Sequence, residues 1–77
     1  MQITLLVFGI LNDILPPQTM VLPAGVDTHQ LQQLLHERYP DLEKYQYGLA
    51  KNQQLIHQHQ PINEGDEIAL LPPFSGG

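Results

Sequence analysis

The chain opens on a stretch of alternating side chains that is typical of a β-strand. In QITLLVF, residues 2–8, the odd-numbered side chains from Ile3 to Val7 share one face, and the even-numbered ones from Thr4 to Phe8 share the other. The odd-numbered face is entirely apolar, whereas the other begins polar and ends apolar. We predict a strand here whose Ile3–Val7 face lies in the core.

A connection with a second strand follows. ILNDIL, residues 10–15, is compatible with a short helical turn, which Pro16 and Pro17 would end. TMVLP, residues 19–23, predicts a second strand, closed by the turn signal from Pro23 to Gly25.

A strong helix signal begins at Asp27, which is placed as an N-cap with Gln30 in the capping-box position. Val26 and Leu31 occupy the positions of a hydrophobic staple around that cap, and Pro40 predicts the end of the helix. The apolar stripe at helical spacing consists of Leu31, Leu34, Leu35 and Tyr39, and the opposite face carries Gln32, Gln33, His36 and Glu37.

The second half of the chain predicts three more strands. Residues 45–56, YQYGLAKNQQLI, predict two short strands joined by a turn at Asn52–Gln53. A polar loop, HQHQP, leads to a turn over Glu64–Asp66 and to a last strand over residues 67–71. In that strand Ile68 and Leu70 share one face, and Ala69 and Leu71 share the other.

One amphipathic helix can cover only one face of a small sheet. We therefore expect an α+β fold of the β-grasp (ubiquitin-like) type over residues 1–71, with a mixed sheet packed on one main helix. Its first and last strands would lie side by side and parallel at the centre, because the connection between them is long. Residues 72–77 would form an extended tail.

Composition narrows the classes of function. The 77 residues make one domain, and the absence of cysteine excludes disulfides, thiolate metal sites and thiol nucleophiles. Acidic residues outnumber basic ones by 8 to 3, which argues against nucleic acid or an anionic membrane as partner and favours a partner with a basic surface. With no basic n-region and no apolar run of spanning length, we expect no signal peptide and a cytoplasmic location.

The titratable residues outside the tail favour structural roles. His57 and His59 alternate in a polar loop, but without carboxylate or thiol neighbours they are better interpreted as exposed than as metal ligands, so no metal site is predicted. His29 and His36 are expected on the helix surface. We interpret the acidic residues Glu64, Asp66 and Glu67 as turn and strand-edge residues, with a further hypothesis that they contact a basic partner.

The last eight residues, LLPPFSGG, change from apolar strand to spacer to bare backbone. Pro72 and Pro73 favour an extended path and lack the amide hydrogens that would continue the strand. Gly76 and Gly77 add no bulk, so the backbone can enter a narrow cleft. This arrangement suits delivery of the terminal carboxylate into another protein's active site, where activation, for instance as an acyl-adenylate, would make it reactive.

An apolar patch is expected beside the root of this tail. If the odd-numbered residues of the first strand face the helix, then Phe8 and Leu71 face away from it, and Leu55 on a neighbouring strand joins them. Exposed patches of this kind often mark binding surfaces. A loop that covers the three residues is the alternative interpretation.

These features together resemble a known family. The ending GDEIALLPPFSGG is similar to the pattern GDE-(apolar)-FPP-x-x-GG of the small subunit of molybdopterin synthase, a MoaD-like branch of the ubiquitin-like sulfur carriers. KNQQLIHQHQPINEGDE is similar to that family's internal VNQ…HPLxxGDE region, and ITLLVFGILNDIL to its first strand and short helix. The chain departs from the family at Asn12, where an arginine is frequent, and at Lys51, where an apolar residue is frequent.

The resemblance implies a function for the tail. Gly77 would be the adenylate and thiocarboxylate site: an adenylyltransferase akin to ubiquitin activators uses ATP, and a sulfur donor then supplies sulfur. Gly76 would thread with it into the large synthase subunit, which provides catalysis and passes the sulfur to a cyclic pyranopterin precursor. The assembly would hold two small and two large subunits, and the carrier itself would be a non-catalytic cosubstrate with no permanently bound cofactor. The implied partner-binding residues are Phe8, Leu55, Leu71, Pro72, Pro73, Phe74 and Ser75.

Three alternatives stay open at this point. A thiamine-pathway (ThiS-like) sulfur carrier has the same fold and tail chemistry. A ubiquitin-like protein modifier would place its tail in an isopeptide bond. A plain interaction domain would keep its function after deletion of Gly77.

Overall fold

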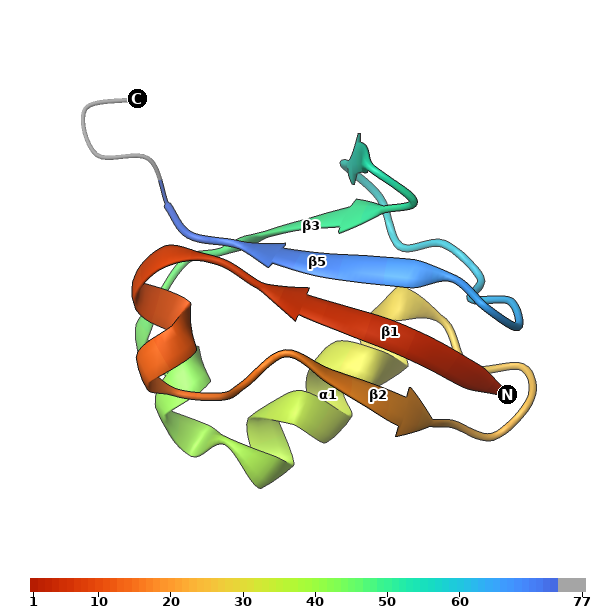
Figure 1. Cartoon of the computed structure of the whole chain (residues 1–77), viewed down its shortest axis with the longest axis horizontal. Coiled ribbons are helices and arrows are strands. Elements are labelled where there is room, and N and C mark those ends of the chain that lie inside the picture. Colours follow the sequence, from red (N-terminus) through yellow and green to blue (C-terminus); the bar gives the residue numbers. More distant parts are fainter. Residues whose placement is uncertain (74–77) are drawn as a thin grey trace.

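The computed structural model describes residues 1–73 of the 77-residue chain. Within that range the chain forms strands, one α-helix and two short 3-10 helices (Figure 1). Their bounds are β1 Gln2–Val7, η1 Gly9–Asp13, β2 Gln18–Val21, α1 Thr28–Arg38, η2 Pro40–Lys44, β3 Gly48–Lys51, β4 Gln54–Ile56 and β5 Glu67–Leu71.

The strands build a single 5-stranded sheet in the order β2-β1-β5-β3-β4. The central pair, β1 and β5, is parallel, with a register that runs from Thr4 opposite Glu67 to Val7 opposite Leu70. All other neighbouring strands are antiparallel. Helix α1 lies across one face of the sheet (Figure 1), so the predicted α+β, β-grasp architecture and its parallel centre are confirmed.

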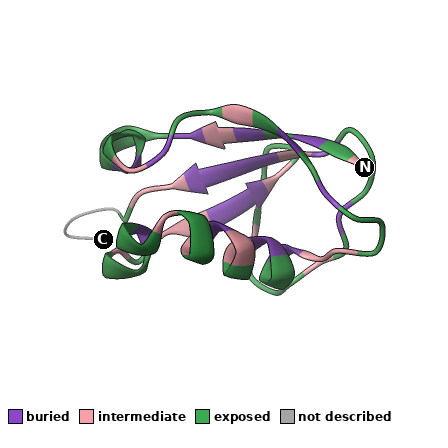
Figure 2. Cartoon of the chain, turned by 90° about the horizontal axis from the view of Figure 1, so that it is seen from below, coloured by how far each residue is buried: buried purple, intermediate pink, exposed green. Residues whose placement is uncertain are grey.

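The core lies between the sheet and α1. Figure 2 shows buried residues gathered on the strands and exposed residues on the outer turns of the helices. Burying an aliphatic side chain of this size stabilises the fold by about 1.5–3 kcal/mol, so the fully apolar face of each central strand is the one that turns inward. Most of the predicted inward residues are buried: Ile3, Leu5 and Val7 of β1, Ile68 and Leu70 of β5, and Leu31 and Leu35 of α1. Leu34 and Tyr39, the other members of the predicted helix stripe, are half-buried and pack against this core.

The start of α1 has the capping box that the sequence predicts. The backbone N–H of Gln30 donates to Asp27 Oδ1 at 2.8 Å, and the backbone N–H of Asp27 donates to Gln30 Oε1 at 2.9 Å. The capping box thereby pairs backbone N–H groups that the first turn of a helix otherwise leaves without a hydrogen-bond partner. The helix ends at Arg38, two residues before Pro40, as predicted. Val26, in the staple position, packs against the core.

The predicted polar face of α1 is only partly exposed. Gln33 and Glu37 are exposed, but Gln32 and His36 are half-buried. Both reach the hydroxyl of Tyr47, at 3.3 Å from Gln32 Nε2 and 2.6 Å from His36 Nε2. The prediction that His36 is a surface residue was therefore wrong, because the segment before β3 folds back against this side of the helix.

The hairpin β3–β4 turns at Asn52 and Gln53, whose positive φ angles of 51° and 71° fit a two-residue hairpin turn that follows the twist of the strands. The turn is confirmed, whereas β2 is shorter than predicted and ends at Val21. In residues 1–73, no helix combines the length and apolar character needed to cross a membrane.

Candidate functional site

The outer face of the sheet, opposite α1, carries an apolar depression of about 500 Å³. Its floor follows one cross-strand row, in which Leu6 lies opposite Ala69, Ala69 opposite Ala50, and Ala50 opposite Leu55. The two alanines in the middle leave the sheet surface low, and larger side chains rise around them. The lining residues are Leu6, Phe8, Ala50, Gln53, Leu55, Glu67, Ala69 and Leu71.

The predicted patch residues Phe8, Leu55 and Leu71 all lie in this depression. Phe8 is 46% exposed and Leu55 is 55% exposed, so no loop within residues 1–73 covers them. Leu71 is half-buried. An exposed phenylalanine and leucine around a shared apolar hollow are a surface suited to protein binding.

Sequence reasoning named only part of this surface. It missed Leu6, Ala50 and Ala69, which form the floor of the depression. The signal was present, because strand alternation already placed Leu6 on the face of Phe8, and Ala69 on the face of Leu71. What could not be read was the register that aligns the alanines of β3 and β5, since pairing between distant strands is a tertiary property.

The tail root lies at the edge of the same surface. Pro72 is half-buried and Pro73 is exposed, and neither continues the ladder of β5. The chain leaves β5 beside the turn that follows β1 (Figure 1), where the backbone N–H of Phe8 donates to the carbonyl of Leu70 at 3.2 Å. The predicted site residues Phe74, Ser75, Gly76 and Gly77 lie outside the described residues.

Gly9 lies directly beneath Pro72. A Cβ on Gly9 would be 2.9 Å from Pro72 Cγ and 3.5 Å from Pro72 Cβ. The first distance is shorter than the contacts that real Cβ atoms make. Gly9 also has a φ of +60°, a region that residues with side chains rarely adopt. Gly9 was not singled out from the sequence, and its contact with Pro72 was missed.

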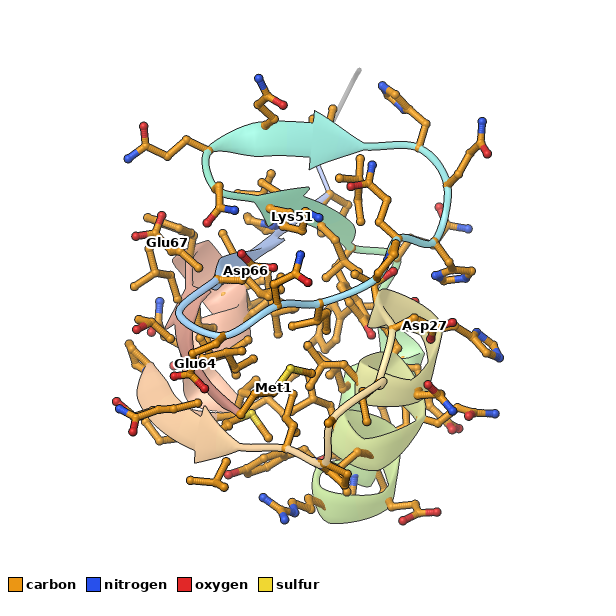
Figure 3. The ribbon with its side chains drawn as sticks, turned by 90° about the vertical axis from the view of Figure 1, so that its right-hand side faces the viewer. Met1, Asp27, Lys51, Glu64, Asp66 and Glu67 are labelled. Carbon is orange, nitrogen blue, oxygen red and sulfur yellow. The ribbon has the colours of Figure 1, made fainter. Side chains whose placement is uncertain are left out.

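At the other end of the sheet, a polar cluster ties the β3–β4 turn to the turn before β5. Asn52 Nδ2 donates to Asp66 Oδ1 at 3.0 Å, and Asn52 Oδ1 accepts from the backbone N–H of Glu67 at 2.9 Å. The backbone N–H of Asn63 donates to Asp66 Oδ2 at 2.8 Å. Figure 3 shows Asp66 at this end of the molecule with Lys51 and Glu67 near it.

These contacts give Asp66 a structural role. Its side chain is buried. The hydrogen bond from the Asn63 backbone lowers the pKa of the carboxyl group, and together with the one from Asn52 and the charge of Lys51 it outweighs burial, which by itself would raise the pKa. A side chain occupied in this way is not available to a basic partner. The hypothesis of acidic partner contacts therefore rests on Glu64 and Glu67, and Glu67 lines the apolar depression.

A smaller polar hollow of about 190 Å³ lies on the helix side of the hairpin, lined by Gln32, Tyr47, His57 and His59 among others. Burial raises the pKa of Tyr47. The ring of His59 lies 4.7 Å from that of His29, and its Nδ1 is 3.2 Å from the hydroxyl of the buried Thr28. His29, His57 and His59 are exposed, as predicted. Over residues 1–73, no group of three or more histidine or acidic side chains is placed to hold a metal ion.

Comparison with solved structures agrees with the fold. SAMP1 from Haloferax volcanii superposes with a TM-score of 0.80 over 99% of each chain at 19% identity, which concerns the fold alone. A chain of the complex of subunits 1 and 2 of molybdopterin-converting factor from Helicobacter pylori matches with a TM-score of 0.77 and 26% identity over 100% of both chains.

Sequence comparison places the chain in a family. The ThiS family matches residues 5–77. The molybdopterin synthase sulfur carrier subunit of Caenorhabditis briggsae is 34% identical over 78% of this chain and 76% of its own length. The protein of the same name from Arabidopsis thaliana is 31% identical over 80% of this chain and 67% of its own length. The chain therefore belongs to the ThiS family and is a homologue of molybdopterin synthase sulfur carrier subunits.

Proposed function

We propose that this protein is the sulfur carrier subunit of a molybdopterin synthase. The observation that carries the proposal is an exposed apolar depression beside the root of a Pro-Pro tail that ends in Gly-Gly, in a chain whose relatives bear that name. The depression supplies a docking surface, and the tail supplies the reacting group.

The chemistry proceeds in two steps at the Gly77 carboxylate. A carboxylate oxygen attacks the α-phosphorus of ATP and displaces pyrophosphate, which leaves an acyl-adenylate. A sulfur donor then supplies sulfur at the oxidation level of sulfide, which attacks the acyl carbon; the bond to AMP breaks, AMP leaves with the electron pair, and loss of a proton gives the thiocarboxylate. A partner adenylyltransferase provides the site for the first step, so the carrier needs no cofactor of its own.

The large synthase subunit is the partner for sulfur transfer. Its active site receives Phe74 to Gly77, and the sulfur passes from Gly77 to the cyclic pyranopterin precursor. Because the product carries two sulfurs, an assembly of two small and two large subunits fits the reaction. Support for a large-subunit partner comes from the related Helicobacter pylori chain, which was solved as a complex of subunits 1 and 2.

Docking on the large subunit uses the described surface. Phe8, Leu55 and Leu71 present apolar area that a partner can bury. Pro72 and Pro73, which follow β5, would lead the chain from this surface toward the partner's active site. Phe8 and Leu55 are the exposed apolar side chains of this surface, and each can contribute binding free energy without rearrangement of the carrier's core.

Intact mass spectrometry tests the proposal. The protein is incubated with a cognate adenylyltransferase, ATP and a sulfur donor, and a mass increase equal to the replacement of one oxygen by sulfur is expected. A variant that lacks Gly77 should keep its circular dichroism spectrum and lose this increase. An unchanged mass of the intact protein, in the presence of an enzyme that modifies a known carrier, would overturn the proposal.

The acceptor separates this proposal from the alternatives. The thiocarboxylated protein should convert the pyranopterin precursor when the large subunit is added, and thiazole formation by a thiazole synthase would instead assign it to the thiamine pathway. Covalent adducts on lysine, resistant to reducing gel electrophoresis, would assign it to protein modification.

A further inference from the structure

The contact between Gly9 and Pro72 joins the start of the chain to the root of its tail. Pro72 Cγ, Cβ and Cδ would lie 2.9, 3.5 and 3.8 Å from a Cβ on Gly9, so the whole ring covers this one backbone position. A side chain on residue 9 would force the half-buried Pro72 ring, or the backbone of residue 9, to shift. The direction in which the chain leaves β5 is thus tied to the conformation of Gly9.

Hydrogen bonds from Asn12 and from Phe8 fix the loop that contains Gly9. Asn12 Nδ2 donates to the carbonyl of Val7 at 3.0 Å and to the carbonyl of Gly9 at 3.2 Å. The backbone N–H of Phe8 donates to the carbonyl of Leu70 at 3.2 Å, two residues before Pro72. The loop under the tail root is therefore anchored both to its own strand and to β5.

We propose that Gly9 is a positioning residue for the tail reaction, and that Asn12 supports it. Gly9 packs against the Pro72 ring, and the ring's constrained φ then sets the direction in which the chain enters Pro73, relative to the depression that contains Phe8 and Leu71. A partner that docks on the depression thereby receives the tail at one defined angle. This inference rests on the proposed carrier function and adds to it a residue that acts through Pro72 rather than on the reacting atoms.

The physical argument is one of alignment. Reacting groups must be held close to their productive geometry, and a misplacement of about 1 Å can cost roughly 100-fold in rate. Docking through the depression and alignment of the tail are separate requirements, because Phe8, Leu55 and Leu71 lie on the sheet face and Gly9 lies under the tail root. A substitution that disturbs the packing of Pro72 on Gly9 should consequently lower kcat and leave the affinity for the partner unchanged.

The test compares Gly9→Ala with Gly25→Ala as thiocarboxylated carriers in sulfur transfer to the pyranopterin precursor by the large synthase subunit, the partner proposed to dock on the depression, with product formation measured at increasing carrier concentrations. Gly25 also has a positive φ, +88°, but nothing lies within 4 Å of a Cβ there, so it reproduces the backbone strain without the contact. For Gly9→Ala we expect kcat to fall roughly tenfold or more while KM changes less than about threefold. Gly25→Ala should match the unsubstituted protein, and both variants are assayed where circular dichroism shows them folded.

A double substitution tests whether the contact itself is responsible. Pro72→Ala removes Cγ and Cδ, so Gly9→Ala added to Pro72→Ala should cause no further loss of kcat. Full additivity of the two losses, or equal rates for Gly9→Ala and Gly25→Ala, would overturn the positioning role and leave the carrier function standing. Failure of the unsubstituted protein to react with a competent enzyme would overturn the carrier function, and this inference with it.

Discussion

Pro72 packs over Gly9 so closely that a Cβ on Gly9 would come within 2.9 Å of Pro72 Cγ. The contact joins two segments from opposite ends of the sequence, because β1 and β5 are parallel neighbours whose carboxyl ends meet at the same edge of the sheet. Residues that follow these two strands are therefore forced together. The root of the tail is part of the folded domain rather than a free extension of it.

This packing has a measurable effect on stability. Gly9→Ala should lower the free energy of unfolding by about 1–2 kcal/mol because a side chain is placed at positive φ, and by about 1–3 kcal/mol more because the Pro72 ring is displaced. Gly25→Ala should pay only the first amount, since open space surrounds its Cβ. Urea denaturation of both variants measures the difference, and equal losses would contradict the close packing.

The apolar depression should govern affinity for the large synthase subunit. Leu55→Ala removes an exposed side chain at its wall, and we expect affinity to fall about tenfold to 100-fold because such anchors typically carry 1–3 kcal/mol. The free energy of unfolding should change by less than about 0.5 kcal/mol, as is usual for surface positions. Isothermal titration calorimetry measures the affinity.

Val21→Ala is the matched control for this experiment. Val21 is an exposed aliphatic residue on β2, 79% accessible, and it does not line the depression. Its substitution should leave the affinity unchanged. A similar loss from both substitutions would mean that the partner does not select the depression.

Asp66 should give the protein a defined acid sensitivity. The fold lowers the pKa of this carboxyl below its unfolded value of about 3.9, so the charged form is favoured in the native state. The resulting stabilisation is fully present above about pH 4 and is lost as the pH falls through the lower native pKa. Asp66→Asn should cost about 1–3 kcal/mol at neutral pH, because an amide NH2 would face the Asn63 N–H in place of an acceptor.

Urea denaturation as a function of pH tests whether the charged carboxylate of Asp66 stabilises the fold. The stability difference between the unsubstituted protein and Asp66→Asn should shrink as the pH falls below about 4. Asp13→Asn serves as control because Asp13 is exposed, and its stability should follow that of the unsubstituted protein at neutral pH. A difference for Asp66→Asn that stays constant down to pH 2 would contradict the assignment.

The capping box of α1 should contribute to stability independently of the site. Asp27→Ala removes the acceptor for the Gln30 N–H and is expected to cost about 1 kcal/mol. Gln33→Ala, in the exposed middle of the same helix, should be neutral or slightly stabilising, because alanine has the higher helix propensity. Thermal denaturation of the two variants compares them, and an unchanged melting temperature for Asp27→Ala would count against the cap.

The order of the strands and of α1, the inward faces of β1 and β5, the helix cap and the hairpin turn were readable from the sequence, whereas the short helix η2 was not predicted. Each depends on neighbours in the chain: alternation identifies Ile3, Leu5 and Val7 as one face, and Asp27 and Gln30 stand in the capping-box positions. The patch residues Phe8, Leu55 and Leu71 followed from the same alternation. The sequence did not show whether a loop covers these three residues, because loop paths depend on contacts between distant segments.

Other features arise only when distant segments meet. The low floor of the depression requires that Ala50 and Ala69 be opposite each other, and Asp66 becomes a structural residue only because Asn52 reaches it from another turn. His36 is half-buried because Tyr47 folds against α1, and a side chain at residue 9 would be crowded because Pro72 covers Gly9. In each case the local sequence permits several environments, and the strand register together with the packing of the chain against itself selects one.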